Sequence, residues 1–180
     1  KNLSIASGVE FWSCLSRNYH ITPDIIEECS DMPWSWDGIS YTPSITMEFI
    51  NDRLGSDSRK ITSINSIAGN MNWTGISQCL NITLSEIGQN PKMPWNWHAI
   101  SLRNDLTTDL VVAHLCIKRW GWYSLSGTAA VTMKLIQDNP DVPWDWRSVS
   151  DNPNLTIEFV KCHQLEGINW NWDAISCKLS

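Results

Sequence analysis

The sequence predicts an all-α fold: an α-solenoid of about seven short (~24-residue) two-helix repeats, one of them degenerate. Two periodic signals predict it. One is a tryptophan followed three residues later by an aliphatic residue and then a serine, and the other is an aliphatic–threonine pair. Two short helices in so few residues cannot bury an apolar face alone, whereas a stack of them can. A leucine-rich β-solenoid shares this period, but no unit carries its L-x-x-L-x-L strand.

The tryptophan signal occurs in seven copies and includes all 12 tryptophans of the 180-residue chain. In five copies a first tryptophan precedes the second by two residues. Successive second tryptophans are 24, 37, 24, 25, 24 and 26 residues apart. The second tryptophans are Trp12, Trp36, Trp73, Trp97, Trp122, Trp146 and Trp172, and the first are Trp34, Trp95, Trp120, Trp144 and Trp170.

The aliphatic–threonine pair explains the one irregular spacing. An extra pair, Ile61-Thr62, lies inside the gap of 37 residues, which indicates a unit that lacks its tryptophans. We therefore expect a single repeat domain over 1–180. Its approximate units are 10–32, 33–52, 53–71 (degenerate), 72–93, 94–119, 120–142, 143–168 and 169–180 (a half unit).

The threonine half of each unit is typical of a capped helix. Threonine is a good N-cap, because its hydroxyl accepts a hydrogen bond from a free amide of the first turn. The aliphatic residue before the threonine and the one four residues after it form a hydrophobic staple, as Leu155 and Val160 do around Thr156. Helices of about 8–11 residues are expected here, for example over 156–164.

The tryptophan half predicts a second, shorter helix. Pro33, Pro94 and Pro143 suit its first position, where a missing N–H costs nothing. The second tryptophan and the aliphatic residue three later share a face, so all seven second tryptophans are expected in the repeat core. On the same helix the five first tryptophans point away from that face. We expect them to be half-exposed or packed on a neighbouring unit, and they are the candidate ligand or partner surface.

Composition excludes two classes of partner. The formal net charge is −6, whereas a nucleic-acid binder needs a basic face. No apolar run approaches the roughly 18 residues of a membrane span. We therefore expect no nucleic acid and no membrane among the partners. The six cysteines form no C-x-x-C pair and are interpreted as small, buried or half-buried apolar residues.

No residue pattern predicts catalysis. The four histidines have no partners at the spacing of a metal site, and neither a nucleophile elbow nor a glycine-rich phosphate loop is present. The sequence therefore predicts a protein that is not an enzyme, with no catalytic residues, no metal and no cofactor. The histidines are His20, His98, His114 and His163.

The string PWDWRSVSDNPNLTIEFV (143–160) resembles the Trp-rich tandem repeats in uncharacterised proteins of giant, mimivirus-like amoebal viruses. The resemblance covers nearly all of the chain, although the copies with Trp12 and Trp73 lack the proline and the first tryptophan. It implies a viral protein in the host cytoplasm or the virion, with no assigned activity. Four N-x-S/T sequons, at Asn2, Asn72, Asn81 and Asn154, leave secretion open.

Two functional hypotheses follow. The first is a non-enzymatic structural or protein-interaction scaffold that binds a viral or host protein or associates with itself. The alternative is a carbohydrate- or peptide-binding module, in which the first tryptophans form a ladder of flat rings that stack on a linear polymer. These hypotheses differ in whether the first tryptophans are exposed.

Overall fold

The computed structural model describes residues 5–42, 45–54, 71–116, 119–163 and 167–179. Within these ranges it contains 13 helices and no strand, so the predicted all-α repeat fold is confirmed. The expected degenerate unit, 53–71, lies almost entirely outside the described residues.

The chain forms two compact units, Lys1–Asn96 and Trp97–Ser180, and the boundary falls inside the repeat expected at 94–119. The N-terminal unit contains α1 (Ile5–Ser16), α2 (Pro23–Glu28), α3 (Trp36–Ile39), α4 (Met47–Leu54), α6 (Trp73–Gln78) and α7 (Leu84–Gln89). The C-terminal unit contains α8 (Trp97–Ile100), α9 (Thr108–Ala113), α10 (Trp122–Ser126), α11 (Met133–Asp138), α12 (Trp146–Val149), α13 (Ile157–Cys162) and α14 (Trp172–Leu179).

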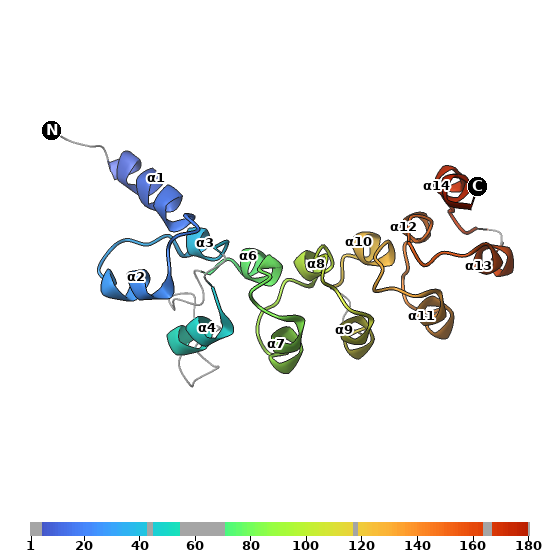
Figure 1. Cartoon of the computed structure of the whole chain (residues 1–180), viewed down its shortest axis with the longest axis horizontal. Coiled ribbons are helices and arrows are strands. Elements are labelled where there is room, and N and C mark those ends of the chain that lie inside the picture. The colour runs from blue at the N-terminus through green and yellow to red at the C-terminus, as the bar shows by residue number, and fades with distance from the viewer. Residues whose placement is uncertain (1–4, 43–44, 55–70, 117–118, 164–166, 180) are drawn as a thin grey trace. The chain divides into compact units, whose positions relative to one another are not determined.

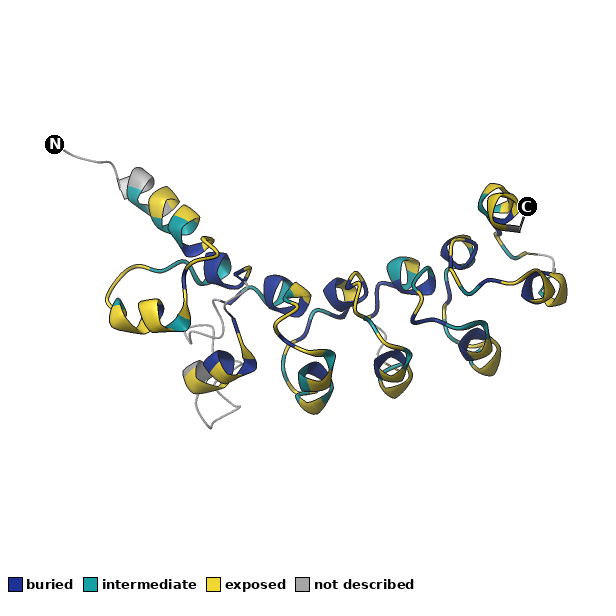
Figure 2. Ribbon diagram, viewed as in Figure 1, coloured by how far each residue is buried: buried dark blue, intermediate teal, exposed yellow. Residues whose placement is uncertain are grey.

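In each of the two compact units, two kinds of helix alternate along the chain. The Trp helices carry the second tryptophans and are α1, α3, α6, α8, α10, α12 and α14; the Thr helices follow a threonine cap and are α2, α4, α7, α9, α11 and α13. Figure 1 shows that within a unit the Trp helices lie in one row and the Thr helices in another. Neighbouring Trp helices pack on each other, as α1 does on α3 and α10 on α12. Figure 2 shows the outer sides of the Thr helices exposed.

The Thr helices begin as the sequence predicts. Each cap has an extended backbone, and its hydroxyl accepts a hydrogen bond from the amide three residues later; the caps are Thr22, Thr83, Thr107, Thr132 and Thr156. The staple is also confirmed, since Val131 and Ile136 around Thr132 are 0% and 2% exposed. A threonine cap contributes about 1 kcal/mol, and burial of the staple places each Thr helix against its neighbours.

The Thr helices are shorter than expected. Five of the six described ones span six residues instead of 8–11, and α13 ends at Cys162. The C-cap residue explains this early end. In α11 the Asn139 side-chain amide donates to the Leu135 carbonyl at 2.9 Å, while the Asn139 carbonyl accepts from the Trp144 indole at 2.9 Å. Carbonyls that a longer helix would use internally are thereby satisfied by side chains.

The Trp helices begin later than expected. The prediction that Pro33, Pro94 and Pro143 occupy the first helical position is wrong, because α3, α8 and α12 each start at the second tryptophan. The residue between the two tryptophans is the N-cap: Asp145, for instance, has an extended backbone and accepts from the Ser148 amide. The proline and the first tryptophan therefore precede the helix, in a tight turn in which the first-tryptophan amide donates to the carbonyl two residues earlier at 2.7–2.8 Å.

A small residue two positions after each second tryptophan lets neighbouring Trp helices approach closely. In the N-terminal unit, a Cβ on Gly75 would lie 2.9 Å from the Ser40 carbonyl oxygen, and one on Gly38 would lie 2.9 Å from the Ser16 Cβ. No residue at this position is larger than cysteine; the seven are Cys14, Gly38, Gly75, Ala99, Ser124, Ser148 and Ala174. Close packing of the Trp helices therefore limits the size of the side chain at this position.

This restriction predicts the effect of adding one methyl group. We expect Gly75→Ala to lower the free energy of unfolding by about 1–3 kcal/mol, because the added Cβ meets backbone rather than a flexible side chain. The control is Gly8→Ala in α1, where nothing lies within 4 Å of the added Cβ. That variant should gain about 0.5–1 kcal/mol from helix propensity. Urea unfolding followed by circular dichroism measures both, and a gain in both variants contradicts the close packing of α6 on α3.

Candidate functional site

The first tryptophans, proposed from the sequence as the partner surface, lie mostly in the interior. Trp95, Trp120, Trp144 and Trp170 are only 4–7% exposed, and Trp34 is half-buried. Of the two alternatives expected from the sequence, half-exposed or packed on a neighbouring unit, the second therefore holds for those four. The physical reason is that only the second tryptophan is helical, so the first tryptophan precedes the helix and a helical wheel does not describe its direction. Its ring packs instead against the second tryptophan of the preceding repeat, as Trp144 does on Trp122 and Trp170 on Trp146.

Each first tryptophan also has a fixed hydrogen-bond partner. Its indole N–H donates to the C-cap carbonyl of the preceding Thr helix, an acceptor that the helix itself leaves free. The five bonds measure 2.8–3.4 Å and run from Trp34 to Cys29, Trp95 to Asn90, Trp120 to His114, Trp144 to Asn139 and Trp170 to His163. The polar end of the indole is thus satisfied although the ring is buried.

The second tryptophans form edge-to-face pairs with the first tryptophans of the next repeat. The ring centroids are 4.8–5.6 Å apart in Trp12–Trp34, Trp73–Trp95, Trp97–Trp120, Trp122–Trp144 and Trp146–Trp170. Of the predicted core series, Trp97 is buried, Trp12, Trp36, Trp73, Trp122 and Trp146 are half-buried, and Trp172 is 55% exposed. The expectation of a core position is wrong for Trp172, over which no first tryptophan lies in the described part of the chain.

A serine ladder joins the same neighbours. In six copies the serine four residues after the second tryptophan accepts a hydrogen bond from the backbone amide of the residue just before the next second tryptophan, at 2.8–3.0 Å. The bonds run from Ser35 to Ser16, Asn72 to Ser40, Asn96 to Ser77, Gly121 to Ser101, Asp145 to Ser126 and Asn171 to Ser150. All six acceptor serines are buried. The sequence shows this serine in every copy but not its partner, which comes from another repeat.

The exposed part of the Trp row is a band that we call the variable stripe. It consists of the residues one and five positions after each second tryptophan, and all of them are exposed or half-exposed. They are Ser13, Arg17, Asp37, Tyr41, Thr74 and Gln78 in the N-terminal unit, and His98, Leu102, Tyr123, Gly127, Arg147, Asp151, Asp173 and Cys177 in the C-terminal unit. Sequence reasoning missed this band because it gave the binding role to the first tryptophans.

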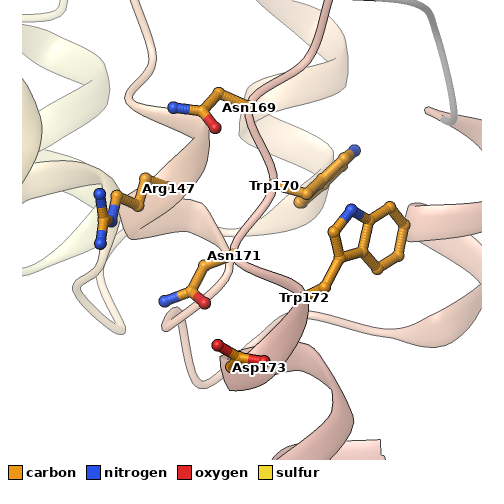
Figure 3. A pocket seen from close by; sticks show the side chains of 6 residues that line it. All are labelled: Arg147, Asn169, Trp170, Asn171, Trp172 and Asp173. Carbon is orange, nitrogen blue, oxygen red and sulfur yellow. The ribbon is translucent and has the colours of Figure 1, made fainter.

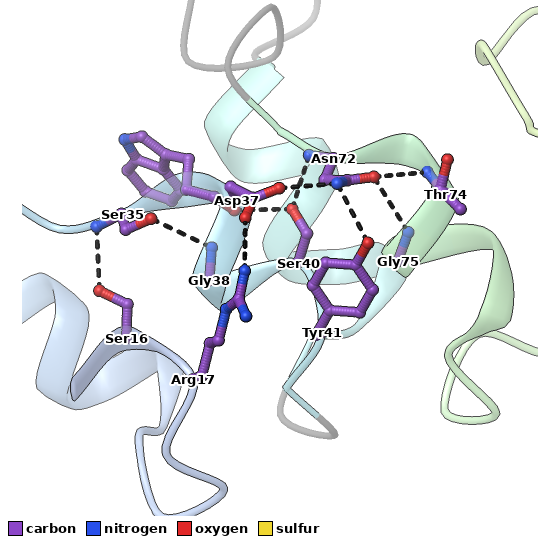
Figure 4. Close-up of polar contacts among 11 residues, drawn as sticks. Ser16, Arg17, Ser35, Asp37, Gly38, Ser40, Tyr41, Asn72, Thr74 and Gly75 are labelled. Carbon is purple, nitrogen blue, oxygen red and sulfur yellow. Dashed lines mark hydrogen bonds and ion pairs between the residues drawn. The ribbon is translucent and has the colours of Figure 1, made fainter. Parts of the chain in front are cut away.

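Polar contacts organise the stripe in the N-terminal unit (Figure 4). Asp37 accepts from the Arg17 guanidinium at 2.9 Å and from the Asn72 side-chain amide at 2.6 Å, and Asn72 also donates to the Tyr41 hydroxyl at 3.1 Å. The hydrogen bond from Asn72, followed by that from Arg17, lowers the pKa of Asp37 below its ordinary value of 3.8. These contacts connect side chains at the three Trp helices α1, α3 and α6.

The C-terminal unit has an open pocket on the same side of the repeat (Figure 3). It is lined by Arg147, Asn169, Trp170, Asn171, Trp172 and Asp173. Arg147 and Asp173 belong to the variable stripe, and the two tryptophans form an apolar wall. Here a first and a second tryptophan line the same solvent-accessible hollow.

The structure also places the cysteines and histidines that the sequence analysis considered as reactive or metal-binding residues. They contain no group of three or more metal-ligating side chains. Four cysteines, at 14, 116, 162 and 177, are exposed rather than buried as expected, and Cys29 and Cys79 are half-buried. No described helix is both long and apolar enough to cross a membrane. His114 and His163 instead cap helices, their Nδ1 atoms lying 3.1 and 2.8 Å from the carbonyl oxygens four residues earlier.

We expect a buried first tryptophan to contribute far more to stability than the exposed Trp172. Trp144→Ala should lower the free energy of unfolding by about 3–5 kcal/mol, because it empties a buried site and frees the Asn139 carbonyl. Trp172→Ala, at an exposed ring, should change it by no more than about 0.5 kcal/mol. Urea unfolding of both variants measures the difference, and equal losses would contradict the two assigned positions.

The polar network of the N-terminal unit predicts a pH dependence. Because the folded-state pKa of Asp37 is depressed, its carboxylate stabilises the fold above pH 3.8, and that contribution is lost as the pH falls through the folded pKa. Asn72→Ser keeps an N-cap oxygen but removes the amide donor, so it should raise the pKa of Asp37. Arg17→Gln should raise it less. NMR titration of the carboxyl carbon measures both shifts; no rise in Asn72→Ser is incompatible with the Asn72 bond.

Comparison with known proteins adds no relative. No protein-family model, curated protein or solved structure matches the chain. The resemblance to giant-virus repeats therefore stays a prediction.

Proposed function

We propose that the chain is a non-enzymatic scaffold that binds a protein or peptide partner along the variable stripe. The proposal rests on a contrast within one chain between the packing residues, which are constant and which we call the framework, and the exposed residues of the variable stripe, which differ. All seven Trp helices keep the second tryptophan, the aliphatic residue three later and the serine that follows it, which hold the stack together. The stripe positions beside them differ from repeat to repeat.

The contrast is large at both stripe positions. One residue after the second tryptophan the chain has serine, aspartate, threonine, histidine, tyrosine, arginine and aspartate in order. Five residues after it stand arginine, tyrosine, glutamine, leucine, glycine, aspartate and cysteine. Packing does not require this variety, because these side chains are exposed or half-exposed. Repeat proteins that bind partners place a varied surface of this kind on a regular scaffold.

The chemistry of the stripe suits a protein partner. In the C-terminal unit it presents Tyr123 and Leu102, 69% and 55% exposed, together with His98 and Arg147. Tyrosine and arginine are enriched among residues that dominate protein–protein binding energy. A net charge of −6 argues against a nucleic-acid partner. A stacking ladder of first tryptophans is not supported, since four of the five are buried.

The framework also favours binding, because it holds the stripe residues in an ordered arrangement in the absence of a partner. Each Trp helix is joined to the next repeat by a buried serine hydrogen bond and, in five cases, by a pair of indole rings. Surfaces that are ordered in advance lose less entropy on binding. The proposal includes the viral setting implied by the repeat strings, in the host cytoplasm or the virion, with a viral or host protein or a second copy as partner.

Selection of peptides against the whole chain tests this function. Peptides from a random library should bind the chain saturably, and the double variant Tyr123→Ala/Arg147→Ala should weaken binding about tenfold or more. The matched control is Val112→Ala/Lys134→Ala, two exposed residues on the Thr helices α9 and α11. Isothermal titration calorimetry measures all three proteins. Equal binding by the stripe variant and the wild type contradicts the proposed surface.

A further inference from the structure

Three hydrogen-bond donors lie at equivalent positions on successive Trp helices of the C-terminal unit. His98, Tyr123 and Arg147 each stand one residue after the second tryptophan, on α8, α10 and α12. All three side chains are exposed, and Tyr123 is 69% exposed. Within the described part of the chain none of the three forms a hydrogen bond or an ion pair. We call these residues the donor row.

The packing of the Trp helices sets the spacing of the donor row. The Gly121 amide donates to Ser101 at 3.0 Å and the Asp145 amide donates to Ser126 at 3.0 Å, so each of the three helices contacts the next. Helices packed in this way lie about 8–10 Å apart, measured between their axes. Donors at equivalent positions therefore recur about every 8–10 Å along the row.

A glycine beside the row keeps the His98 ring in position. Gly121 is the N-cap of α10 and makes no side-chain cap hydrogen bond. The His98 ring occupies the space that a Cβ on Gly121 would need. The imidazole therefore lies at the start of α10, two residues before Tyr123 in the chain.

One type of peptide backbone has a period that matches this spacing. In a polyproline II helix the same side returns after three residues, which is a rise of about 9.3 Å. In an extended strand the same side returns after about 6.6 Å, and in an α-helix after about 5.4 Å. A polyproline II segment therefore presents one face to each Trp helix, whereas a strand or an α-helix loses register with the row.

The donor row also complements the charge of a polyproline II backbone. Such a backbone has no internal hydrogen bonds, so the partial negative charges on its carbonyl oxygens need donors from outside. The His98 imidazole, the Tyr123 hydroxyl and the Arg147 guanidinium supply donors, one for each turn. The exposed Tyr123 ring adds an apolar face on which a proline ring can pack, as aromatic residues do in grooves that bind proline-rich peptides. An amphipathic helix would instead need a continuous apolar groove, which this row does not provide.

We propose that the donor row binds a proline-rich segment of a partner protein in the polyproline II conformation, over about nine residues. The inference rests on the proposed function, because it specifies the partner of the variable stripe in the C-terminal unit. Each donor binds a backbone carbonyl from one turn, and a proline packs on the Tyr123 ring. The next residue of the series, Asp173, is a hydrogen-bond acceptor, so the row comprises three turns.

Two synthetic peptides of equal length test the proposal. The probe contains three copies of Pro-Pro-Ser, which favour polyproline II, and the control contains three copies of Ala-Ala-Ser with the same end groups. The anisotropy of a fluorescent label on each peptide measures binding to the whole chain. We expect saturable binding of the probe with a dissociation constant below about 1 mM, and binding of the control that is about tenfold weaker or worse.

Variants of the whole chain locate the probe. Tyr123→Ala should weaken binding about tenfold or more, and His98→Ala and Arg147→Ala should each weaken it by a smaller factor. Tyr123→Phe keeps the ring but loses the hydroxyl, so its affinity should lie between those of Tyr123→Ala and the wild type. These side chains are exposed, so the changes should leave folding intact. The matched control is Tyr19→Ala, a tyrosine 68% exposed outside the stripe, which should bind the probe as the wild type does.

Three results would overturn the proposal. One is the absence of saturable binding of the Pro-Pro-Ser peptide up to about 1 mM. The second is equal binding of the two peptides, which would show that the polyproline II backbone is not recognised. The third is undiminished binding by Tyr123→Ala, or an equal loss in Tyr19→Ala, which would place the probe away from the donor row.

The peptide selection described for the proposed function separates the two proposals. Selected peptides that depend on Tyr123 and Arg147 but contain no proline would support the stripe as a binding surface and contradict a polyproline II partner. Selected peptides that bind equally well to the stripe variant would contradict the proposed function itself. Stripe-dependent peptides with proline at every third position support both proposals.

Discussion

The hydrogen bond from a first-tryptophan indole to the C-cap carbonyl of the preceding Thr helix is the interaction on which the rest of the structure depends. In the repeat of Trp144 the Asn139 carbonyl at the end of α11 accepts this bond, which anchors the buried ring. The same ring then presents itself edge-on to Trp122. One side chain thus marks the end of one helix, fills the core and contacts the neighbouring repeat.

The serine ladder and the small residue two positions after each second tryptophan are consequences of the same geometry. With both tryptophans pointing inward, the amide between them meets a serine of the preceding repeat, as Asp145 meets Ser126 at 3.0 Å. Trp helices at this separation leave no room for a larger side chain, as Gly75 shows against the Ser40 carbonyl. Since these contacts join nearest neighbours, stability accumulates repeat by repeat.

A framework of this kind decides which residues are free for function. Tryptophans, aliphatic residues and serines are used in packing, so the variable stripe is what a partner can contact along the Trp row. The last Trp helix is the exception, because Trp172 is a framework residue with an exposed ring.

The sequence by itself determined the repeat period, the alternation of two helix types, the threonine caps and the aliphatic staples, because these are local patterns within one repeat. The tertiary structure decided which tryptophans are buried. A helical wheel over Pro143–Ser150 assumes that both tryptophans share a helix, yet Asp145 caps the helix and Trp144 lies before it. The partners of Trp144, Ser126 and Gly75 lie in other segments of the chain, and no local pattern identifies them. For the same reason, Trp172 carries the core motif and is nevertheless exposed: its burial depends on a neighbour, not on its own repeat.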